Sequence, residues 1–169
     1  MSGPLLAEVR RARTADVPGI RALVDANTAD RRLLAKATVT LYEDIQEFGV
    51  AVDGERVVGC GALHVLWEDL AEVRTLAVVK DAQGQGVGAA LLTRLIENAR
   101  LLGVRRLFCL TFETAFFAQH GFLPAFDELV APDVLAELMQ SADEGVAEFL
   151  DLARVKPNTL GNTRMIALL

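Results

Sequence analysis

The sequence predicts an α/β fold, with one domain over residues 1–169 and a mixed antiparallel and parallel central sheet flanked by helices. The first reason is a β-hairpin signal at 50–66, where Asp53-Gly54 separates two runs rich in β-branched residues. The second is the order strand, glycine-rich loop, helix, strand over 71–112, which is typical of a parallel strand pair with a crossover helix. A chain of 169 residues is also long enough for one compact core.

The N-terminal elements follow from periodicity and from capping signals. Residues 8–13 alternate and predict a first strand, and 14–28 have the spacing of an amphipathic helix with Thr14 as its N-cap. A second, shorter helix is expected at 40–49, closed by Gly49. Helices are therefore expected between the first strand and the hairpin.

The strongest helix pattern lies at 86–102, where apolar residues recur at helical spacing until Gly103. This helix joins a strand at 71–79 to one at 105–112, whose near-continuous apolar run indicates a central strand buried on both faces. Three further elements are expected in the C-terminal part: a short helix within 113–122, a helix at 131–141 and a last strand at 163–169.

The composition excludes several classes of protein. The chain is 52% hydrophobic and 24% charged, as in a globular protein and unlike a disordered one. Its net charge of −6 argues against a nucleic-acid-binding protein, because phosphate backbones select basic surfaces. Cys60 and Cys109 lie in apolar runs without metal-ligand spacing, which predicts two buried free thiols and no metal site. No signal peptide and no apolar run of ~20 residues is found, so we expect a soluble, cytoplasmic protein.

The segment KDAQGQGVGAALL (80–92) places three alternating glycines at the start of the long helix. Glycine lets backbone N–H groups crowd around an anion at the positive end of a helix dipole, so the loop predicts a phosphate site. A Walker A loop is excluded, because Gly88 is followed by two alanines in place of Lys-Ser/Thr. The dinucleotide fingerprint GxGxxG/A is matched by Gly84, Gly86 and Ala89, but that fold turns directly off its strand and usually opens its domain. A tight glycine turn without a ligand is the remaining alternative.

A third pattern, Gln-x-x-Gly-x-Gly, begins at Gln83, and here the sequence resembles a known family. The run VRTLAVVKDAQGQGVGAALLTRLIENAR is similar to the acetyl-coenzyme A signature of GNAT N-acetyltransferases. The later FFAQHGF is similar to the second landmark of that family, an aromatic residue before Gly-Phe. The resemblance implies a GNAT-like domain with acetyl-CoA as co-substrate and with a glutamine in place of the commoner arginine. The residues implied to bind this cofactor are Gln83, Gly84, Gln85, Gly86, Val87, Gly88 and Ala89, together with the backbone amides of Leu76, Ala77 and Val78, which would also hold the oxyanion.

Further segments resemble stand-alone amino-acid N-acetyltransferases of the N-acetylglutamate synthase type, among them LLAKATVTLYEDIQEF, VVGCGALHVLWEDLAEVRTLAV and VKPNTLGNTRM. The resemblance covers nearly the whole chain and implies acetyl transfer to the α-amino group of L-glutamate, or of glutamine, at the start of arginine biosynthesis. Larger relatives have an arginine-sensing kinase-like domain, for which this chain has no room, so feedback through it is not expected. The alternatives are a GNAT enzyme for another small amine or a peptide N-terminus, and an acyl-CoA-binding regulatory module without catalysis.

Acetyl transfer needs a base, because an amine at neutral pH is mostly protonated. The resemblance implies Glu72, on the strand before the loop, in this role. The alternative for this residue is a solvated strand-end carboxylate, with Glu68 and Glu113 as further candidate bases. Many relatives protonate the departing thiolate with a tyrosine just before Gly-Phe, where this chain has two phenylalanines. Thr114 or a water is then the candidate acid, or coenzyme A leaves as a thiolate, since thiols ionise near ~8.5.

Two cations are candidates for binding the carboxylates of an amino-acid substrate. The synthases have a basic residue that grips the substrate at a position like that of Lys36, and strand alternation puts Arg74 on one face with Glu72 and Leu76. The alternatives are an exposed loop lysine and an arginine that pairs with Glu72. Beyond the small-molecule substrate, we expect no nucleic-acid or membrane partner, and a homodimer is one option.

Overall fold

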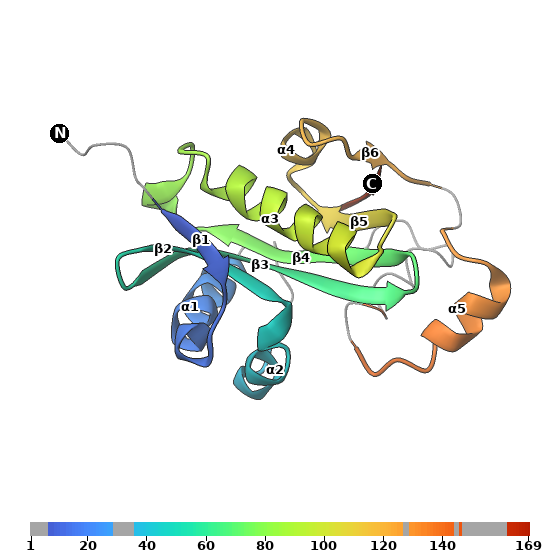
Figure 1. Ribbon diagram of the computed structural model, residues 1–169, viewed down its shortest axis with the longest axis horizontal. Helices are drawn as coiled ribbons and strands as arrows, with labels where there is room; N and C mark the ends of the chain where they lie inside the picture. Colours follow the sequence, from blue (N-terminus) through green and yellow to red (C-terminus); the bar gives the residue numbers. More distant parts are fainter. Residues whose placement is uncertain (1–6, 29–35, 127–128, 144–145, 147–161) are drawn as a thin grey trace. The chain divides into compact units, whose positions relative to one another are not determined.

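The computed structural model of the protein describes residues 7–28, 36–126, 129–143, 146 and 162–169. In these residues seven strands form a sheet in the order β1-β2-β3-β4-β5-β7-β6 (Figure 1). The strands are β1 (Glu8–Arg11), β2 (Phe48–Asp53), β3 (Arg56–Trp67), β4 (Leu70–Val78), β5 (Arg106–Thr111), β6 (Leu123–Pro124) and β7 (Thr163–Leu168). The helices and 3-10 turns are η1 (Thr14–Asp16), α1 (Val17–Thr28), α2 (Thr38–Glu43), η2 (Ile45–Glu47), η3 (Lys80–Ala82), α3 (Val87–Leu102), α4 (Thr114–Ala118) and α5 (Pro132–Leu138).

The sheet is mixed, as predicted. β1, β2 and β3 pair antiparallel, β7 pairs antiparallel with β5 and β6, and β4 pairs parallel with β5 after the α3 crossover. The chain divides into two compact units, which we call the N-terminal unit (1–64 and 73–102) and the C-terminal unit (65–72 and 103–169). One domain over 1–169 therefore stays a prediction. In the described part of the chain, no helix is both long and apolar enough to span a bilayer.

In the N-terminal unit, helices cover both faces of the strands (Figure 1). α1 and α2 pack with Val50 and Cys60 on one face, whereas α3 packs with Ala51 and Val58 on the other. Val50 and Ala51 are neighbours in β2, and the strand period of two sends their side chains to opposite faces. The predicted hairpin is confirmed, with its turn at Gly54 in the left-handed region at φ 60°.

The strand β3 has glycines where α3 crosses it. A Cβ at Gly59 would lie 2.8 Å from Leu91 Cδ1 and 3.3 Å from the Ala77 carbonyl oxygen. A Cβ at Gly61 would lie 3.0 Å from Leu95 Cδ1. Because real Cβ atoms rarely approach so closely in packed interiors, these glycines let the helix lie directly on the strands. The start of α3, and the glycine loop before it, is held in place by this packing.

In the C-terminal unit, β5 is the central strand that its apolar run predicted. Leu107, Phe108 and Cys109 are all buried, and the strand lies between β4 and β7. Phe108 packs in a cluster with Leu70 and with Leu138 of α5. The short strand β6 had no prediction, because two residues are too few to show a period.

Gly49 does not close a helix, which corrects the prediction for 40–49. α2 and η2 end earlier, and Gly49 lies within β2, paired with Arg11 on one side and Gly61 on the other. Ladder hydrogen bonds on both sides of the residue outweigh its local signal as a helix terminator. A single sequence shows the local signal but not the partner strands.

The cap of the first helix also differs from the prediction. Thr14 lies inside the 3-10 turn η1, and the carboxylate of Asp16 accepts the Arg13 backbone N–H at 2.7 Å. The same carboxylate accepts two hydrogen bonds from the Arg10 guanidinium, at 2.8 and 3.0 Å. The hydrogen bonds from Arg10 are the main reason that the pKa of Asp16 is lowered from its ordinary value of 3.8.

We expect Asp16→Asn to lower the free energy of unfolding by about 1–3 kcal/mol at pH 7, because it removes a charged acceptor from a largely buried pair. On acidification the unfolded chain takes up the proton first, since its Asp16 pKa is the higher one. The stabilisation is therefore present above about pH 4 and is lost as the pH falls through the lower pKa of the folded state. Urea unfolding at pH 7 and near pH 3 measures both effects.

The matched control is Asp25→Asn, which breaks the exposed Arg21–Asp25 pair of α1. Exposed pairs of this spacing contribute about 0.3–0.5 kcal/mol, so this variant should remain close to wild type. Equal losses in the two variants would contradict the role given to Asp16.

Candidate active site

The glycine loop connects η3 to α3 in the N-terminal unit. Gly84 and Gly86 have φ angles of 73° and 81°, in the region that residues with a side chain rarely adopt. A Cβ added at either glycine would meet no atom within 4 Å, so the loop is open on that side. The first helical hydrogen bond runs from Ala90 N–H to the Gly86 carbonyl, and the amides of 87–89 therefore precede the helical ladder. At the positive end of a helix dipole, such amides can bind a diphosphate without a lysine.

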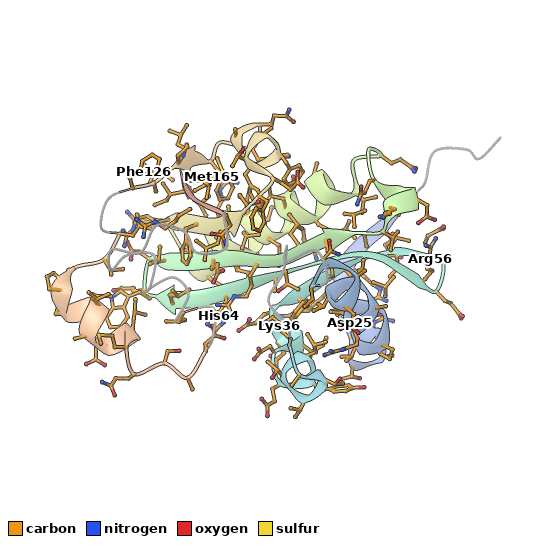
Figure 2. The ribbon with its side chains drawn as sticks, turned by 180° about the vertical axis from the view of Figure 1, so that it is seen from behind. Asp25, Lys36, Arg56, His64, Phe126 and Met165 are labelled. Atoms are coloured by element: carbon orange, nitrogen blue, oxygen red, sulfur yellow. The ribbon has the colours of Figure 1, made fainter. Side chains whose placement is uncertain are left out.

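Side chains on both flanks hold this loop in shape. The Gln83 Nε2 amide donates to the Val78 carbonyl at 3.0 Å, and the Gln85 Nε2 amide donates to the Asp81 carbonyl at 2.9 Å. Arg56, labelled at the end of the hairpin in Figure 2, forms a bidentate ion pair with the Asp81 carboxylate. Gln83, predicted as a donor to the cofactor, therefore gives one N–H to the protein itself, and its contact with the cofactor stays a prediction.

β4 has an unusual backbone immediately before the predicted oxyanion amides. Thr75 is buried and has φ 57°, which is a genuine outlier for a β-branched residue and costs about 1–3 kcal/mol. Its carbonyl accepts a hydrogen bond from the Cys60 thiol at 3.3 Å. Arg74 and Leu76, on either side of Thr75, are both half-buried, and their place on one face with Glu72 stays a prediction. The roles of the Leu76, Ala77 and Val78 amides stay predictions.

Glu72 belongs to the C-terminal unit, where it is 5% exposed and paired with Phe108 in the parallel ladder. Burial raises the pKa of the Cys109 thiol, and the negative charge of Glu72 raises it further. Glu68 and Glu113, the other candidate bases, are both exposed. Glu72 is thus the carboxylate of the three that is shielded from bulk water, although its catalytic role stays a prediction.

The second sequence landmark forms an aromatic cluster. Phe117 meets Phe116 and Phe122 edge to face, with ring centroids 5.2 and 5.1 Å apart. His120 Nδ1 lies 2.8 Å from the Phe116 carbonyl oxygen, in keeping with a structural histidine. Thr114 is the exposed first residue of α4, and its role as an acid stays a prediction.

The predicted substrate cations lie in different parts of the N-terminal unit. Lys36 precedes the first residue of α2 by two positions, and its carbonyl accepts a hydrogen bond from the Arg21 guanidinium of α1. Arg74 is half-buried in β4. Figure 2 shows Lys36 and Asp25, the ion-pair partner of Arg21, on the same side of this unit.

Arg164 of β7 is a buried cation for which the sequence analysis made no prediction. It is 9% exposed, and its Nε donates to the Ala125 carbonyl at 3.2 Å. An arginine inside the apolar run TRMIALL is the signal that could have indicated it, because buried guanidinium groups are uncommon and suit carboxylates. Among the described residues, no group of three or more His, Cys, Asp or Glu side chains could hold a metal ion.

A comparison with known protein families agrees with the glycine loop at the start of the crossover helix and with the mixed sheet. Residues 18–122 match the acetyltransferase (GNAT) family. The chain belongs to the GNAT acetyltransferase family. This confirms the predicted family, the fold class and the enzyme class.

The relatives of this GNAT protein include a named amino-acid acetyltransferase and crystal structures that contain coenzyme A. An amino-acid acetyltransferase of Mycobacterium tuberculosis is 55% identical over 164 residues, which is 95% of this chain and 94% of that protein. A crystal structure from the same organism, in complex with CoA and NLQ, has a TM-score of 0.89 and 55% identity over 96% of this chain and 99% of that one. N-acetylglutamate synthase of Neisseria gonorrhoeae, complexed with coenzyme A and N-acetyl-glutamate, has a TM-score of 0.76 and 26% identity. That match covers 99% of this chain and 36% of the longer synthase chain.

Proposed function

We propose that the protein is an amino-acid acetyltransferase that moves the acetyl group of acetyl-CoA to the α-amino group of L-glutamate or glutamine. The observation that supports this most is the 55% identity to the Mycobacterium tuberculosis amino-acid acetyltransferase over nearly the full length of both chains. The N-acetylglutamate synthase among the structural neighbours supports the choice of substrate. A cytoplasmic location, a homodimer and a place at the start of arginine biosynthesis belong to the same proposal.

The cofactor is bound through its diphosphate. The open side of the loop at Gly84 and Gly86 would leave room for the phosphates. The first N–H groups of a helix point out along its axis, so the amides of 87–89 are the ones expected to bind them. Binding by backbone amides suits a chain with a net charge of −6, because the positive potential is local to the helix end.

In the reaction, Glu72 takes a proton from the substrate ammonium, directly or through a water. The free amine attacks the thioester carbonyl, and the amides of Leu76 to Val78 stabilise the oxyanion as the C–N bond forms. Collapse of this intermediate breaks the C–S bond and releases coenzyme A as a thiolate. The nitrogen carries two protons after the attack and loses one of them, which reaches the thiolate through Thr114 or a water, and Glu72 returns its own proton to solvent. Direct attack in a ternary complex needs no covalent enzyme intermediate.

An assay of coenzyme A release tests the proposal. We expect L-glutamate or glutamine to give the highest kcat/KM among the twenty amino acids, with the N-acetyl product identified by mass spectrometry. Faster acetylation of lysine or of a peptide N-terminus would show another GNAT specificity. Binding of coenzyme A without release from any amine would show a regulatory module.

Lys36 provides a test of the amino-acid site. We expect Lys36→Ala to lower kcat/KM for glutamate about tenfold, because a charge-assisted contact contributes roughly 1.5–3 kcal/mol. The Kd for acetyl-CoA should change by less than about twofold, since the cation is assigned to the other substrate. Lys36→Arg keeps the charge and should retain most of the activity. Unchanged glutamate kinetics in both Lys36→Ala and Arg74→Ala would remove the support that these residues give to the glutamate assignment.

A further inference from the structure

The Arg56–Asp81 ion pair joins the glycine loop to a distant part of the chain. Arg56 is the first residue of β3, and its two guanidinium nitrogens lie 2.8 and 3.0 Å from the two carboxylate oxygens of Asp81 in η3. Close by, the Val79 N–H donates to the Val58 carbonyl, so the end of β4 is also fixed to β3. Exposed ion pairs contribute little to stability, but a bidentate arginine–carboxylate fork fixes orientation well.

Asp81 is connected to the loop through its backbone as well. Its carbonyl accepts the side-chain amide of Gln85, the residue between the two left-handed glycines. A shift of Asp81 therefore shifts Gln85 and the glycines on either side. Glycines make the loop conformationally free, so a fixed anchor before them reduces the number of conformations that the cofactor must select.

The carboxylate of Asp81 is negative, like the diphosphate that the loop is proposed to bind. It precedes Gly84 by three residues, and the Arg56 guanidinium lowers its pKa, so it is ionised at neutral pH. An anion near a diphosphate site repels the ligand over about one Debye length, which is ~8 Å at physiological salt. The net charge of the chain is −6, so the protein as a whole offers no positive potential to offset the Asp81 carboxylate. The guanidinium of Arg56 cancels this charge locally.

We propose that Arg56 favours cofactor binding chiefly by cancelling the negative charge of Asp81 before the glycine loop, with the orientation that the ion pair gives to Asp81 as the smaller contribution. This inference rests on the proposed binding of acetyl-CoA, but not on the identity of the amino-acid substrate. It predicts an order of effects that a purely structural pair would not produce. Loss of Arg56 exposes the Asp81 charge, whereas loss of the Asp81 charge leaves an additional cation near the phosphates.

The experiment measures the Kd for coenzyme A by calorimetry, with KM for acetyl-CoA and kcat, in the full-length wild-type protein and four variants of it. Arg56→Ala should raise Kd and KM about three- to tenfold at low salt and leave kcat within about twofold. Asp81→Asn should remain within about twofold of wild type, and the double variant should recover most of the loss. The matched control is Arg100→Ala, which removes the same charge from an exposed site near the far end of α3, ~20 Å along the helix.

The outcomes separate this inference from the proposed function. If the wild-type protein fails to bind coenzyme A, both are wrong. If the wild type and Arg56→Ala bind coenzyme A with the same Kd, only this inference is overturned. It is also overturned if the double variant binds coenzyme A as weakly as Arg56→Ala does. A defect in Arg56→Ala that shrinks as ionic strength rises supports charge cancellation, and a defect equal to that of Arg100→Ala contradicts it.

Discussion

The Glu72→Gln variant is expected to have a kcat about 10²- to 10⁴-fold below that of the wild type, because it lacks the base that deprotonates the substrate amine. The substitution keeps the volume of a side chain that is 5% exposed, so the fold should persist. The Kd for acetyl-CoA should remain within about twofold, since no cofactor contact is removed. The defect should become smaller as the pH rises, because a larger fraction of the amine is then already free.

Steady-state kinetics from pH 6 to about pH 10 measures this, with Glu68→Gln and Glu113→Gln as controls at exposed positions. Both controls should keep wild-type rates. Wild-type kcat in Glu72→Gln at pH 7, together with a loss in one of the controls, would transfer the role to that residue.

The second large effect is expected for Gly86→Val. Gly86 has φ 81°, which valine adopts only with strain, and the added side chain would occupy the open side of the loop where the diphosphate is proposed to bind. Loss of two charge-assisted contacts of roughly 1.5 kcal/mol each corresponds to about a 100-fold rise in the Kd for acetyl-CoA. Calorimetry or a thermal-shift titration with coenzyme A measures this change.

Gly103→Val separates strain from ligand exclusion. Gly103 ends α3 with φ 88° and likewise has no atom within 4 Å of an added Cβ, so the backbone penalty is matched. This variant should lose similar thermal stability and bind coenzyme A like the wild type. Equal loss of binding in both variants would mean that Gly86 acts through stability alone.

NADH should stabilise neither variant nor the wild type against thermal unfolding. Stabilisation by NADH equal to that by acetyl-CoA would contradict the acetyl-CoA assignment and favour a dinucleotide-binding loop.

The parts of the fold that could be predicted are those with a strong local cause. The Asp53-Gly54 turn, the apolar stripe of α3 and its end at Gly103 each depend on residues close together in the sequence, and the structure confirms all three. The glycine loop belongs to the same class, because its left-handed backbone requires glycine at 84 and 86. The assignment to a family depended on this loop and on a second landmark at a defined distance from it.

The parts that could not be predicted depend on partners distant in sequence. Gly49 has the local signal of a helix end, but pairing with β1 on one side and β3 on the other holds it in an extended conformation. Nothing in the identity of Thr75 indicates a left-handed backbone, which only the surrounding β4 packing can impose. Arg56 and Asp81 are 25 residues apart and look like ordinary surface charges until the hairpin brings them together.

The two buried cysteines have a practical consequence for studying motion in this protein. Cys60 lies in the N-terminal unit and Cys109 in the C-terminal unit, and both are buried free thiols. Burial raises the pKa of Cys60 to about 12, so the folded chain presents almost no reactive thiolate at neutral pH. Each thiol can therefore react with a labelling reagent only when the structure around it opens, and the labelling rate of each reports the opening free energy of its own unit. Two single-cysteine variants separate the two signals. Cys109→Ala keeps Cys60, whose labelling rate reports opening of the unit with the glycine loop, and Cys60→Ala keeps Cys109, whose rate reports opening of the unit with Glu72.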